Sequence, residues 1–312
     1  MNRPLSRRLV CAGSVVVDIV MKVPGLPEPG GDVVARSAKL AVGGAFNVMA
    51  AARSQGMKVA YVGGHGTGPF GDIVRSSLME RGIEIIAPAA TRLDTGFSIT
   101  FVTADGERTF ATSPGAEATL TLDALRSVPI APADLVYISG YGLAYPDSGP
   151  ALAGWLSHLD TVVTVVVDPG PLVADIPRPL LREVAARCNW WTCNEREARL
   201  ITGAASPYDS IRGLAELAGR NGVLVRLGPD GCLLLMRGHD VQLFPARPVE
   251  VIDTTGAGDV HTGTFLAALA NRVEPSEAVR RANVAASIAV SQYGPATAPT
   301  LEQLRAALAA DC

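Results

Sequence analysis

The sequence predicts an α/β protein with a mostly parallel central sheet and helices on both of its faces. Short runs rich in Val, Ile and Leu alternate with longer helical segments, the order typical of repeated strand–helix–strand units. The run 162–167 is β-branched at every position, as expected of a strand buried on both faces. Two stretches, 21–42 and 95–112, depart from this alternation and predict a small second sheet.

The composition is that of a folded chain. Of its 312 residues, 48% are hydrophobic and 18% are charged, which excludes an intrinsically disordered protein. At roughly 150 residues per domain this length allows one large domain or two. We expect a single domain over residues 1–312, with the small sheet inserted into it. The net charge of −3 and the lack of a basic segment argue against a nucleic-acid partner.

The start of the chain imitates a signal peptide. Arg3, Arg7 and Arg8 precede the apolar stretch 9–20, but Asp18 interrupts that stretch, so we expect a buried first strand instead. No other apolar run approaches the ~20 residues of a membrane span, so we expect no membrane partner. The five cysteines are scattered, which predicts free thiols and a cytoplasmic location.

The expected elements can be placed along the chain. Strands are expected at 9–19, 58–62, 135–139, 162–167, 190–193 and 223–227. Helices are expected at 45–54, 71–81, 149–159, 179–187, 195–202, 210–221 and about 260–272. Within 95–112, apolar and polar residues alternate, and Asp105–Gly106 predicts a hairpin turn. We interpret both irregular stretches as antiparallel strands of a lid over one end of the main sheet.

The segment Asp253–Asp259, with the sequence DTTGAGD, is the strongest motif. Small residues just before a helix leave backbone N–H groups free, and the helix N-terminus adds a partial positive charge. Such an anion hole stabilises charge on a transferring phosphoryl group. Asp259 would lie at its mouth, where the positive helix end keeps it ionised and able to take a proton from an alcohol. The alternative is a plain turn with an acidic N-cap.

Polar residues of two other segments should reach the same place. Asp18 ends the first expected strand, and Gly43–Gly44 precedes the helix that bears Asn47. In a parallel sheet, strand carboxyl ends and helix N-termini share one edge, so Asp18, Asn47 and Asp259 can converge there. Carboxylates and amides are suitable hydroxyl binders. The alternative is that Asp18 only ends a strand and Asn47 only caps a helix.

Two later turns are weaker candidates. Asn194 and Glu197 share one face of a first helical turn and suit hydrated Mg²⁺ or the water shell of a phosphate, although such a pair can also simply cap the helix. Gly228–Gly231 follows the strand at 223–227. It predicts either a β-turn or a backbone shelf for a nucleotide, with Arg226 near the phosphates.

One motif points to a different class of enzyme. Residues 66–71, GTGPFG, match the dinucleotide-binding pattern G-x-G-x-x-G between a strand and a helix. However, Pro69 removes an N–H that a pyrophosphate would use, and no acidic residue ends the next strand ~20 positions on. A nicotinamide-dependent dehydrogenase is therefore the weaker alternative. The pattern G-x-x-x-x-G-K-[ST] is missing from the sequence, which excludes a P-loop kinase.

Taken together, these motifs resemble those of the ribokinase-like (PfkB) carbohydrate kinase family, nearly from end to end. The matching segments, in the family's order, are 13–18, 43–47, 63–71, 105–108, 194–197, 228–231, 253–259 and 283–287. The resemblance implies a three-layer α/β/α ribokinase-like fold with a small β-sheet lid, often used for dimerisation. It also implies transfer of the γ-phosphate of ATP to a primary hydroxyl of a sugar or nucleoside.

The resemblance further implies a role for each matching residue. The catalytic residues would be the base Asp259 and the anion-hole amides of Gly256, Ala257 and Gly258. The acceptor contacts would be Asp18, Gly44 and Asn47. The residues on the Mg²⁺ and nucleotide side would be Asn194, Glu197, Arg226, Gly228, Gly231 and Asn283. A monovalent-cation site, usually for K⁺, would include Asp253 and Thr255.

The sequence also departs from ribokinase, which puts ribose in doubt as the substrate. Val16 stands where ribokinase has a sugar-binding Asn, Met49 replaces a small residue, and Val260–His261 replaces Ala-Phe. The segment 43–47 is one residue shorter than in ribokinase. We expect a sugar or nucleoside partner, with the lid offering a surface for a homodimer. A non-catalytic sugar or nucleoside sensor is the other alternative, although a sensor has no need of a base in an anion hole.

Overall fold

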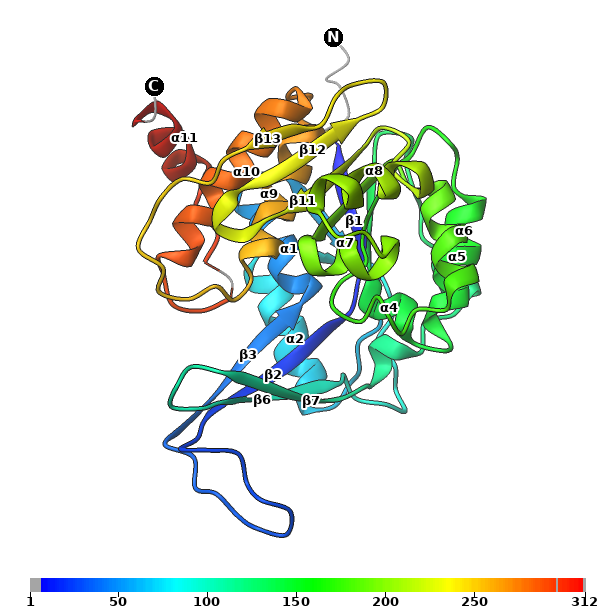
Figure 1. The fold of residues 1–312 in the computed structure, drawn as a ribbon. Helices are drawn as coiled ribbons and strands as arrows, with labels where there is room; N and C mark the ends of the chain where they lie inside the picture. The colour runs from blue at the N-terminus through cyan, green and yellow to red at the C-terminus, as the bar shows by residue number, and fades with distance from the viewer. Residues whose placement is uncertain (1–6, 296, 311–312) are drawn as a thin grey trace.

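A nine-stranded sheet with helices on both faces forms the body, and a four-stranded sheet projects from one end of it (Figure 1). The computed structural model describes residues 7–295 and 297–310. The large sheet has the order β13-β12-β11-β10-β9-β8-β1-β4-β5. Its pairs are parallel from β5 to β11, and β12 and β13 are antiparallel additions. The predicted three-layer α/β fold with a mostly parallel sheet and a lid is confirmed.

The strands divide between the two sheets. The large sheet consists of β1 (Arg8–Ala12), β4 (Lys58–Tyr61), β5 (Glu84–Ile85), β8 (Leu135–Ser139), β9 (Thr164–Asp168), β10 (Trp190–Asn194), β11 (Gly222–Arg226), β12 (Cys232–Met236) and β13 (Gln242–Phe244). The small sheet, called the lid below, consists of β2 (Val15–Lys22), β3 (Ser37–Gly44), β6 (Phe97–Val102) and β7 (Arg108–Ser113).

Eleven α-helices and two short 3₁₀ turns are described. The helices are α1 (Ala45–Ser54), α2 (Pro69–Glu80), α3 (Leu122–Arg126), α4 (Gly140–Ala144), α5 (Ser148–His158), α6 (Arg178–Arg187), α7 (Glu195–Thr202), α8 (Pro207–Leu217), α9 (Ala257–Ala270), α10 (Pro275–Val290) and α11 (Leu301–Ala310). The 3₁₀ turns are η1 (Ala116–Ala118) and η2 (Gly228–Asp230).

Side-chain alternation along the central strands creates the two helical layers. Successive residues of a strand point to opposite faces. Accordingly, Leu9 and Cys11 of β1 join a buried cluster with α1, α2, α9 and α10, whereas Val10 and Ala12 join a cluster on the other face that includes α5, α6 and α8. The near-continuous apolar strands follow from this burial on both sides.

The expected single strand over residues 9–19 is wrong, because the chain forms two strands in two different sheets. β1 ends at Ala12 and β2 begins at Val15, and Gly13–Ser14 leads from the large sheet into the lid. A Cβ atom at Gly13 would lie only 2.4 Å from the Cβ atom of Ala45, so glycine lets the chain pass α1. Both halves are apolar, and hydrophobicity therefore carries no sign of the break.

We expected a purely antiparallel lid, but one of its strand pairs is parallel. The pairs β2–β3 and β6–β7 are antiparallel, but β2 and β6 run parallel side by side. The expected turn at Asp105–Gly106 does connect β6 to β7, and Gly106 adopts a positive φ of 87° there. The lid also takes in residues 15–20, which lie before the expected range 21–42 and of which 15–19 were expected in the first strand.

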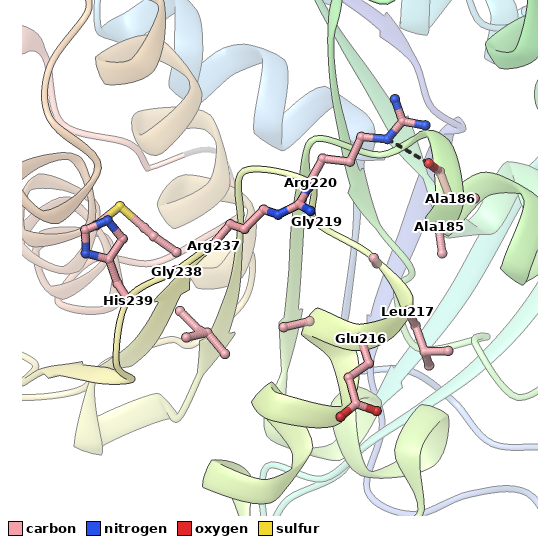
Figure 2. Close-up of a pocket in the computed structure, with 13 residues that line it drawn as sticks. Ala185, Ala186, Glu216, Leu217, Gly219, Arg220, Arg237, Gly238 and His239 are labelled. Carbon is pink, nitrogen blue, oxygen red and sulfur yellow. Dashed lines mark hydrogen bonds between the residues drawn. The ribbon is translucent and has the colours of Figure 1, made fainter.

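A hollow of about 440 Å³ lies at the end of the sheet where β10 and β11 begin (Figure 2). Its lining includes Glu216, Gly219, Arg220 and Arg237. Arg220 is held in place there because its Nε donates a hydrogen bond of 3.0 Å to the carbonyl of Ala186. None of the candidate site residues lines this hollow.

The thiols are buried, in line with the scattered cysteine positions. Cys11, Cys188, Cys193 and Cys232 are all free, and Cys312 lies outside the described residues. Among the helices of residues 7–295 and 297–310, none has the length and apolar character needed to cross a membrane.

Candidate active site

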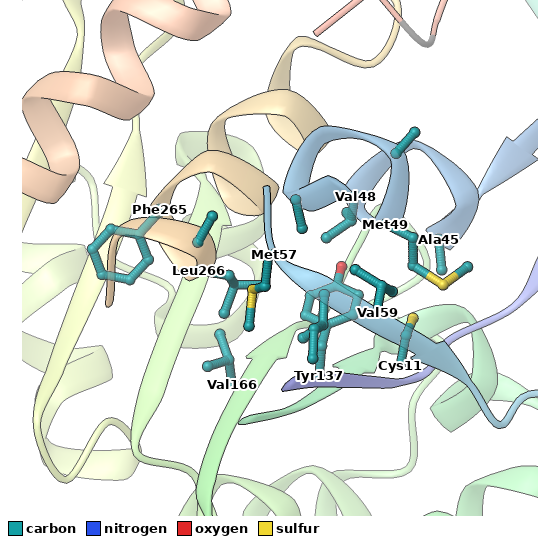
Figure 3. Packing of buried hydrophobic residues seen from close by; sticks show 14 of the residues in the cluster. Cys11, Ala45, Val48, Met49, Met57, Val59, Tyr137, Val166, Phe265 and Leu266 are labelled. Carbon is teal, nitrogen blue, oxygen red and sulfur yellow. The ribbon is translucent and has the colours of Figure 1, made fainter. Parts of the chain in front are cut away.

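Two helices from distant parts of the chain bring Asn47 and Asp259 together. α1 and α9 pack side by side on one face of the large sheet, where Val48 and Leu266 belong to the same buried cluster (Figure 3). Gly263 permits this approach, because a Cβ atom there would lie 2.4 Å from the carbonyl oxygen of Val48. As a result, the Asn47 Nδ2 group donates a 3.1 Å hydrogen bond to Asp259 Oδ2.

Asp259 is a carboxyl group with a strongly raised pKa. It lies in the first turn of α9, and burial raises its pKa to about 7, against the lowering effect of the Asn47 hydrogen bond. The nearby carboxylates of Asp168 and Glu197 also raise its pKa, and Arg226 lowers it. The expectation that the helix N-terminus keeps Asp259 ionised is thus offset by desolvation. A pKa near neutrality suits a general base.

The turn before α9 requires its first glycine. Gly256 is the N-cap of the helix, with a positive φ of 75°, and a Cβ atom there would lie 2.3 Å from the carbonyl oxygen of Pro295. The amide of Ala257 closes the turn by donating to Thr254 O at 3.2 Å, so this amide already has an acceptor. α9 begins at Ala257, three residues earlier than expected, and Asp259 is therefore inside the helix.

Asp18 lies on the lid rather than at the end of a body strand. In β2 it pairs with Ala41 of β3 and with Ser98 of β6. Gly43 makes room for its side chain, since a Cβ atom at Gly43 would lie 2.0 Å from Asp18 Oδ2. Burial raises the pKa of Asp18 to about 6. Gly44 has a φ of 65° and caps the N-terminus of α1, which carries Asn47.

Tyr141, at the start of α4, shares the surroundings of both aspartates. Burial raises its pKa, and the charges of Asp259 and Asp18 raise it further. The phenol therefore stays protonated and can act as a hydrogen-bond donor at neutral pH. Tyr141 thus belongs to the same end of the sheet as Asn47 and Asp259.

Arg226 lies beneath the N-terminus of α9 in a dense set of hydrogen bonds. Its guanidinium is 3.1 Å from Asp168 Oδ2 and 3.8 Å from Glu197 Oε2. It also donates to Thr192 Oγ1 at 2.6 Å and to Thr262 Oγ1 at 3.2 Å. These bonds fix the side chain. From the sequence we expected Arg226 to lie near the nucleotide phosphates, but its existing partners leave it less free to bind one.

Asp168 is a residue of this site that was not predicted from the sequence. It is buried at the carboxyl end of β9, binds Arg226 and raises the pKa of Asp259. The sequence does contain a signal for Asp168. It directly follows the apolar run 162–167, at the edge where ligands bind in such sheets.

Asn194 and Glu197 form a reciprocal capping box at the start of α7. Glu197 N donates to Asn194 Oδ1, and the Asn194 backbone N donates to Glu197 Oε2, each at 2.8 Å. A third bond of 2.8 Å joins Asn194 Nδ2 to Glu197 Oε1. Burial raises the pKa of Glu197, and Asp168 raises it further. Both carboxylate oxygens therefore already have a donor within the chain.

The residues expected on the nucleotide side lie around the ends of β11 and β13. Gly228 begins η2, and Gly231 follows it with a φ of 102°. A Cβ atom at Gly231 would lie 2.0 Å from the carbonyl oxygen of Phe244, so this position requires glycine. Asn283 Nδ2 donates to that same carbonyl at 2.8 Å, and its Oδ1 is 3.1 Å from His261 Nε2.

Asp253 connects three parts of the chain. Its Oδ1 accepts from Thr255 N at 2.9 Å and from Thr255 Oγ1 at 2.6 Å, and its Oδ2 accepts from Gly294 N at 3.2 Å. Arg108 of the lid also donates to Oδ1, at 2.7 Å. These donors lower the pKa of Asp253 to about 2, despite some desolvation, so the carboxylate is charged at any working pH.

The G-x-G-x-x-G stretch is filled by the protein's own carboxylate. Asp94 accepts from Phe70 N at 2.9 Å and from Gly71 N at 2.7 Å. The amide of Gly66 donates to Thr95 Oγ1 at 2.9 Å. The amides that a pyrophosphate would need are thus bound to side chains, and the structure gives the dehydrogenase alternative no support.

Nearly the whole chain matches one known protein family. Residues 6–302 match the model of a family described as pfkB family carbohydrate kinase. An uncharacterized sugar kinase of Escherichia coli, YegV, is 32% identical over 301 residues, covering 95% of this chain and 92% of YegV. Ribokinase of Haemophilus influenzae is 28% identical over 298 residues, covering 93% and 94% of the two chains.

The same fold occurs among solved structures. Ribokinase of Arabidopsis thaliana, solved with ribose and ATP, superposes with a TM-score of 0.83 at 23% identity. The superposition covers 97% of this chain and 98% of the plant enzyme. At this level of identity the match shows the fold alone, and the family model and the curated relatives carry the assignment further.

Proposed function

Because the chain belongs to the pfkB family of carbohydrate kinases, and is therefore a phosphotransferase with an alcohol group as acceptor, we propose that it transfers the γ-phosphate of ATP to a primary hydroxyl of a sugar or nucleoside. The observation that carries this proposal is the partly buried carboxyl group of Asp259, bonded to Asn47 in the first turn of α9. The complex of the Arabidopsis ribokinase with ATP supports ATP as the donor.

In the proposed reaction Asp259 is the general base. The acceptor binds beneath the lid between Asp18, the Gly44 turn and Asn47, so that its primary hydroxyl faces the Asp259 carboxylate. Asp259 takes the hydroxyl proton while the oxygen attacks the γ-phosphorus in line and the bond to the β-phosphate oxygen breaks. The Asn47 amide holds the carboxylate in its reactive orientation.

In this proposal the negative charge on the transferring phosphoryl group is stabilised by the N-terminus of α9. The turn Gly256–Gly258 presents backbone amides at the positive end of a 14-residue helix. We assign these amides to the anion hole, with Gly256 and Gly258 carrying more of the role because the Ala257 amide binds Thr254 O. Gly228, Gly231 and Asn283 shape the shelf for the nucleotide, and Arg226 supports that shelf from beneath.

Asn194 and Glu197 fit Mg²⁺ best through its water shell. Their capping box leaves no bare carboxylate oxygen, and no cluster of three metal-ligating residues occurs in the described ranges 7–295 and 297–310. Mg²⁺ usually keeps several waters and takes its other ligands from the substrate phosphates. Bound there, the ion would neutralise the phosphate charge. Glu197 and Asn194 would orient its waters.

Asp253 and Thr255 are the candidate monovalent-cation ligands. Carboxylate and backbone oxygens are suitable for such an ion, and the low pKa of Asp253 keeps its charge available. The Arg108 guanidinium already binds Asp253 Oδ1, however, so a K⁺ ion would share the carboxylate with it. The contribution of K⁺ would be electrostatic support of the anion-hole loop.

The test is ADP release from Mg²⁺-ATP, with K⁺ present, against a panel of sugars, sugar acids and nucleosides. We expect one acceptor class to give turnover, and the variant Asp259→Asn to lose ~10²–10⁴ in kcat, as for other general bases. Asp240→Asn, at an exposed aspartate between β12 and β13, is the matched control and should keep full activity.

The same assay separates the kinase from the alternatives. Wild-type kcat in Asp259→Asn would remove this residue from the mechanism. Saturable binding of a sugar or nucleoside without turnover by any acceptor on the panel would favour a sensor. Failure to bind ATP would contradict the nucleotide half of the proposal.

A further inference from the structure

We propose that Arg108, at the free end of the lid, is a positioning residue that fastens the closed lid to the anion-hole loop through Asp253. This inference goes beyond the proposed function by naming how closure over the acceptor is coupled to the catalytic loop. It rests on the proposed function only in taking that loop to be catalytic. Three observations support it. The base of the lid is fixed to the body, the β6–β7 hairpin carries Arg108 away from that base, and Asp253 binds both Arg108 and the catalytic loop.

The base of the lid is clamped to the body by one buried side chain. Glu117 of η1 accepts a 2.8 Å hydrogen bond from Gly96 N, just before β6, and another of 2.8 Å from Gly115 N, just after β7. The rings of Phe70 in α2 and Phe97 in β6 pack nearby, with centroids 5.2 Å apart. Both ends of the β6–β7 hairpin are therefore held at one point.

Arg108 lies at the opposite end of the same hairpin. It is the first residue of β7, just after the turn at Asp105–Gly106, and β7 is one of the two edge strands of the lid. A strand of six residues spans ~20 Å. Arg108 is thus separated from the Glu117 clamp by the length of β7, and its bond to Asp253 ties the far end of the hairpin to the body.

The partner of Arg108 is the residue that shapes the catalytic loop. Asp253 Oδ1, which receives the guanidinium, also holds the backbone and hydroxyl of Thr255, one residue before Gly256. The side chain of Arg108 is 34% exposed and that of Asp253 is 16% exposed. The pair is therefore partly shielded from water, where a charge-assisted hydrogen bond is stronger than on an open surface.

In this proposal the Arg108–Asp253 contact is made in the closed lid and broken in an open one, so it favours closure and the ordered loop together. Two such events coupled through one bond stabilise each other reciprocally, typically by ~5-fold or more in equilibrium constant. Arg108 does not need to touch the acceptor for this. Its removal should weaken acceptor binding and loosen the loop, while the base and its Asn47 partner stay in place.

The experiment compares Arg108→Gln with Arg108→Lys and with a control, Arg36→Gln. Arg36 is an exposed arginine in the loop between β2 and β3, so its variant loses the same charge from the lid. The first measurement is amide hydrogen exchange over residues 97–113 and 253–258, with and without ATP. The second is KM for the acceptor and kcat, on the acceptor found by the panel.

We expect Arg108→Gln to speed exchange in both segments and to raise KM for the acceptor by ~5-fold, with a smaller change in kcat. Arg108→Lys keeps the charge but loses the planar fork, so its values should lie between those of the wild type and Arg108→Gln. Arg36→Gln should match the wild type.

Two results would overturn the proposal: unchanged exchange in both segments of Arg108→Gln, or equal changes in Arg36→Gln. Because hydrogen exchange needs no turnover, the latch can be judged even where the panel yields no acceptor. Failure of the proposed kinase activity is thus distinguishable from failure of the latch.

Discussion

At the scale of single residues, the site depends on a carboxyl group that is difficult to ionise. The partly buried Asp259 has a pKa of about 7, and Asp18 on the lid has a pKa of about 6, both raised by desolvation. A general base must be deprotonated to act, whereas desolvation makes the protonated form of a carboxyl group the more stable one. Activity and stability should therefore respond to pH in opposite directions.

We expect kcat/KM to rise with pH up to about 7, where Asp259 loses its proton, and to level off above it. The sign for stability is the reverse. Because the folded pKa of Asp259 lies above its unfolded value of 3.8, the stabilisation is complete below pH 3.8 and is lost as pH rises through about 7. Asp18 adds to the same slope below pH 6 or so.

Activity profiles and urea unfolding between pH 5 and 8 would test this pair of trends. In Asp259→Asn the loss of stability with rising pH should be reduced, since Asp18 and Glu197 are then the carboxyl groups with a raised pKa that still contribute to it. A wild-type enzyme whose activity is flat from pH 5 to 8 would contradict the assignment of a base with a neutral pKa.

At the scale of elements, the base of the lid depends on Glu117. This side chain is 1% exposed and accepts the amides at both ends of the β6–β7 hairpin. Those two glycines are needed, because a Cβ atom at Gly96 would lie 2.3 Å from Glu117 Oε1 and one at Gly115 would lie 2.3 Å from Gly96 N. The hairpin can therefore leave the body only as a closely paired set of strands.

We expect Glu117→Gln to lower the free energy of unfolding by about 1.5–3 kcal/mol, the usual contribution of a hydrogen bond to a charged group, because the amide can accept only one of the two N–H groups well. Chemical denaturation measures this loss. Glu183→Gln, at an exposed glutamate of α6, is the control and should change stability by less than about 0.5 kcal/mol. Equal stability of both variants would show that the clamp is not needed.

Helices and central strands of the body were the elements most open to prediction. The expected helices at 45–54 and 195–202 and the strand at 135–139 have the observed bounds. Local signals define them, namely apolar periodicity and the glycines or caps at their ends. The split of the first strand and the parallel β2–β6 pair could not be predicted this way, because they depend on contacts with distant segments.

The features of the site also divide into those that could be predicted from the sequence and those that depend on contacts between distant segments. The meeting of Asn47 with Asp259 was expected, because both residues follow from the shared edge of strand ends and helix starts. The partners of Arg226 and Asp94 were not, since which carboxylate fills which set of donors depends on side-chain packing. The pKa of Asp259 was misjudged for a related reason: the sequence shows the helix end but does not show the depth of burial.

At the scale of the whole molecule, the lid presents an apolar outer face. Strand register places Leu40, Ile19 and Ile99 side by side, on the face opposite to that of Asp18. Leu40 is 57% exposed. An apolar patch of neighbouring side chains on a projecting sheet is typical of a surface that pairs with a partner, and we propose that a second copy of the chain covers it.

We expect the wild-type protein to be a homodimer in solution and Leu40→Asp to be a monomer, because a carboxylate in the middle of an apolar interface is costly to bury. Light scattering after size-exclusion chromatography gives both masses. The control is Lys39→Asp, one residue away on the opposite face of β3, which should remain dimeric. A monomeric wild-type protein would contradict this use of the lid.

The division of labour between the two sheets has a mechanical consequence. Asp18 belongs to a lid strand, whereas Asn47 and Asp259 belong to helices of the body. The chain crosses between these parts at glycine positions, Gly13 and Gly44 among them. The distance between the acceptor hydroxyl and the Asp259 carboxylate is therefore set by the angle between the lid and the large sheet. Substitutions at Gly13 or Gly44 can change that angle, and with it the reaction rate, without contacting the acceptor.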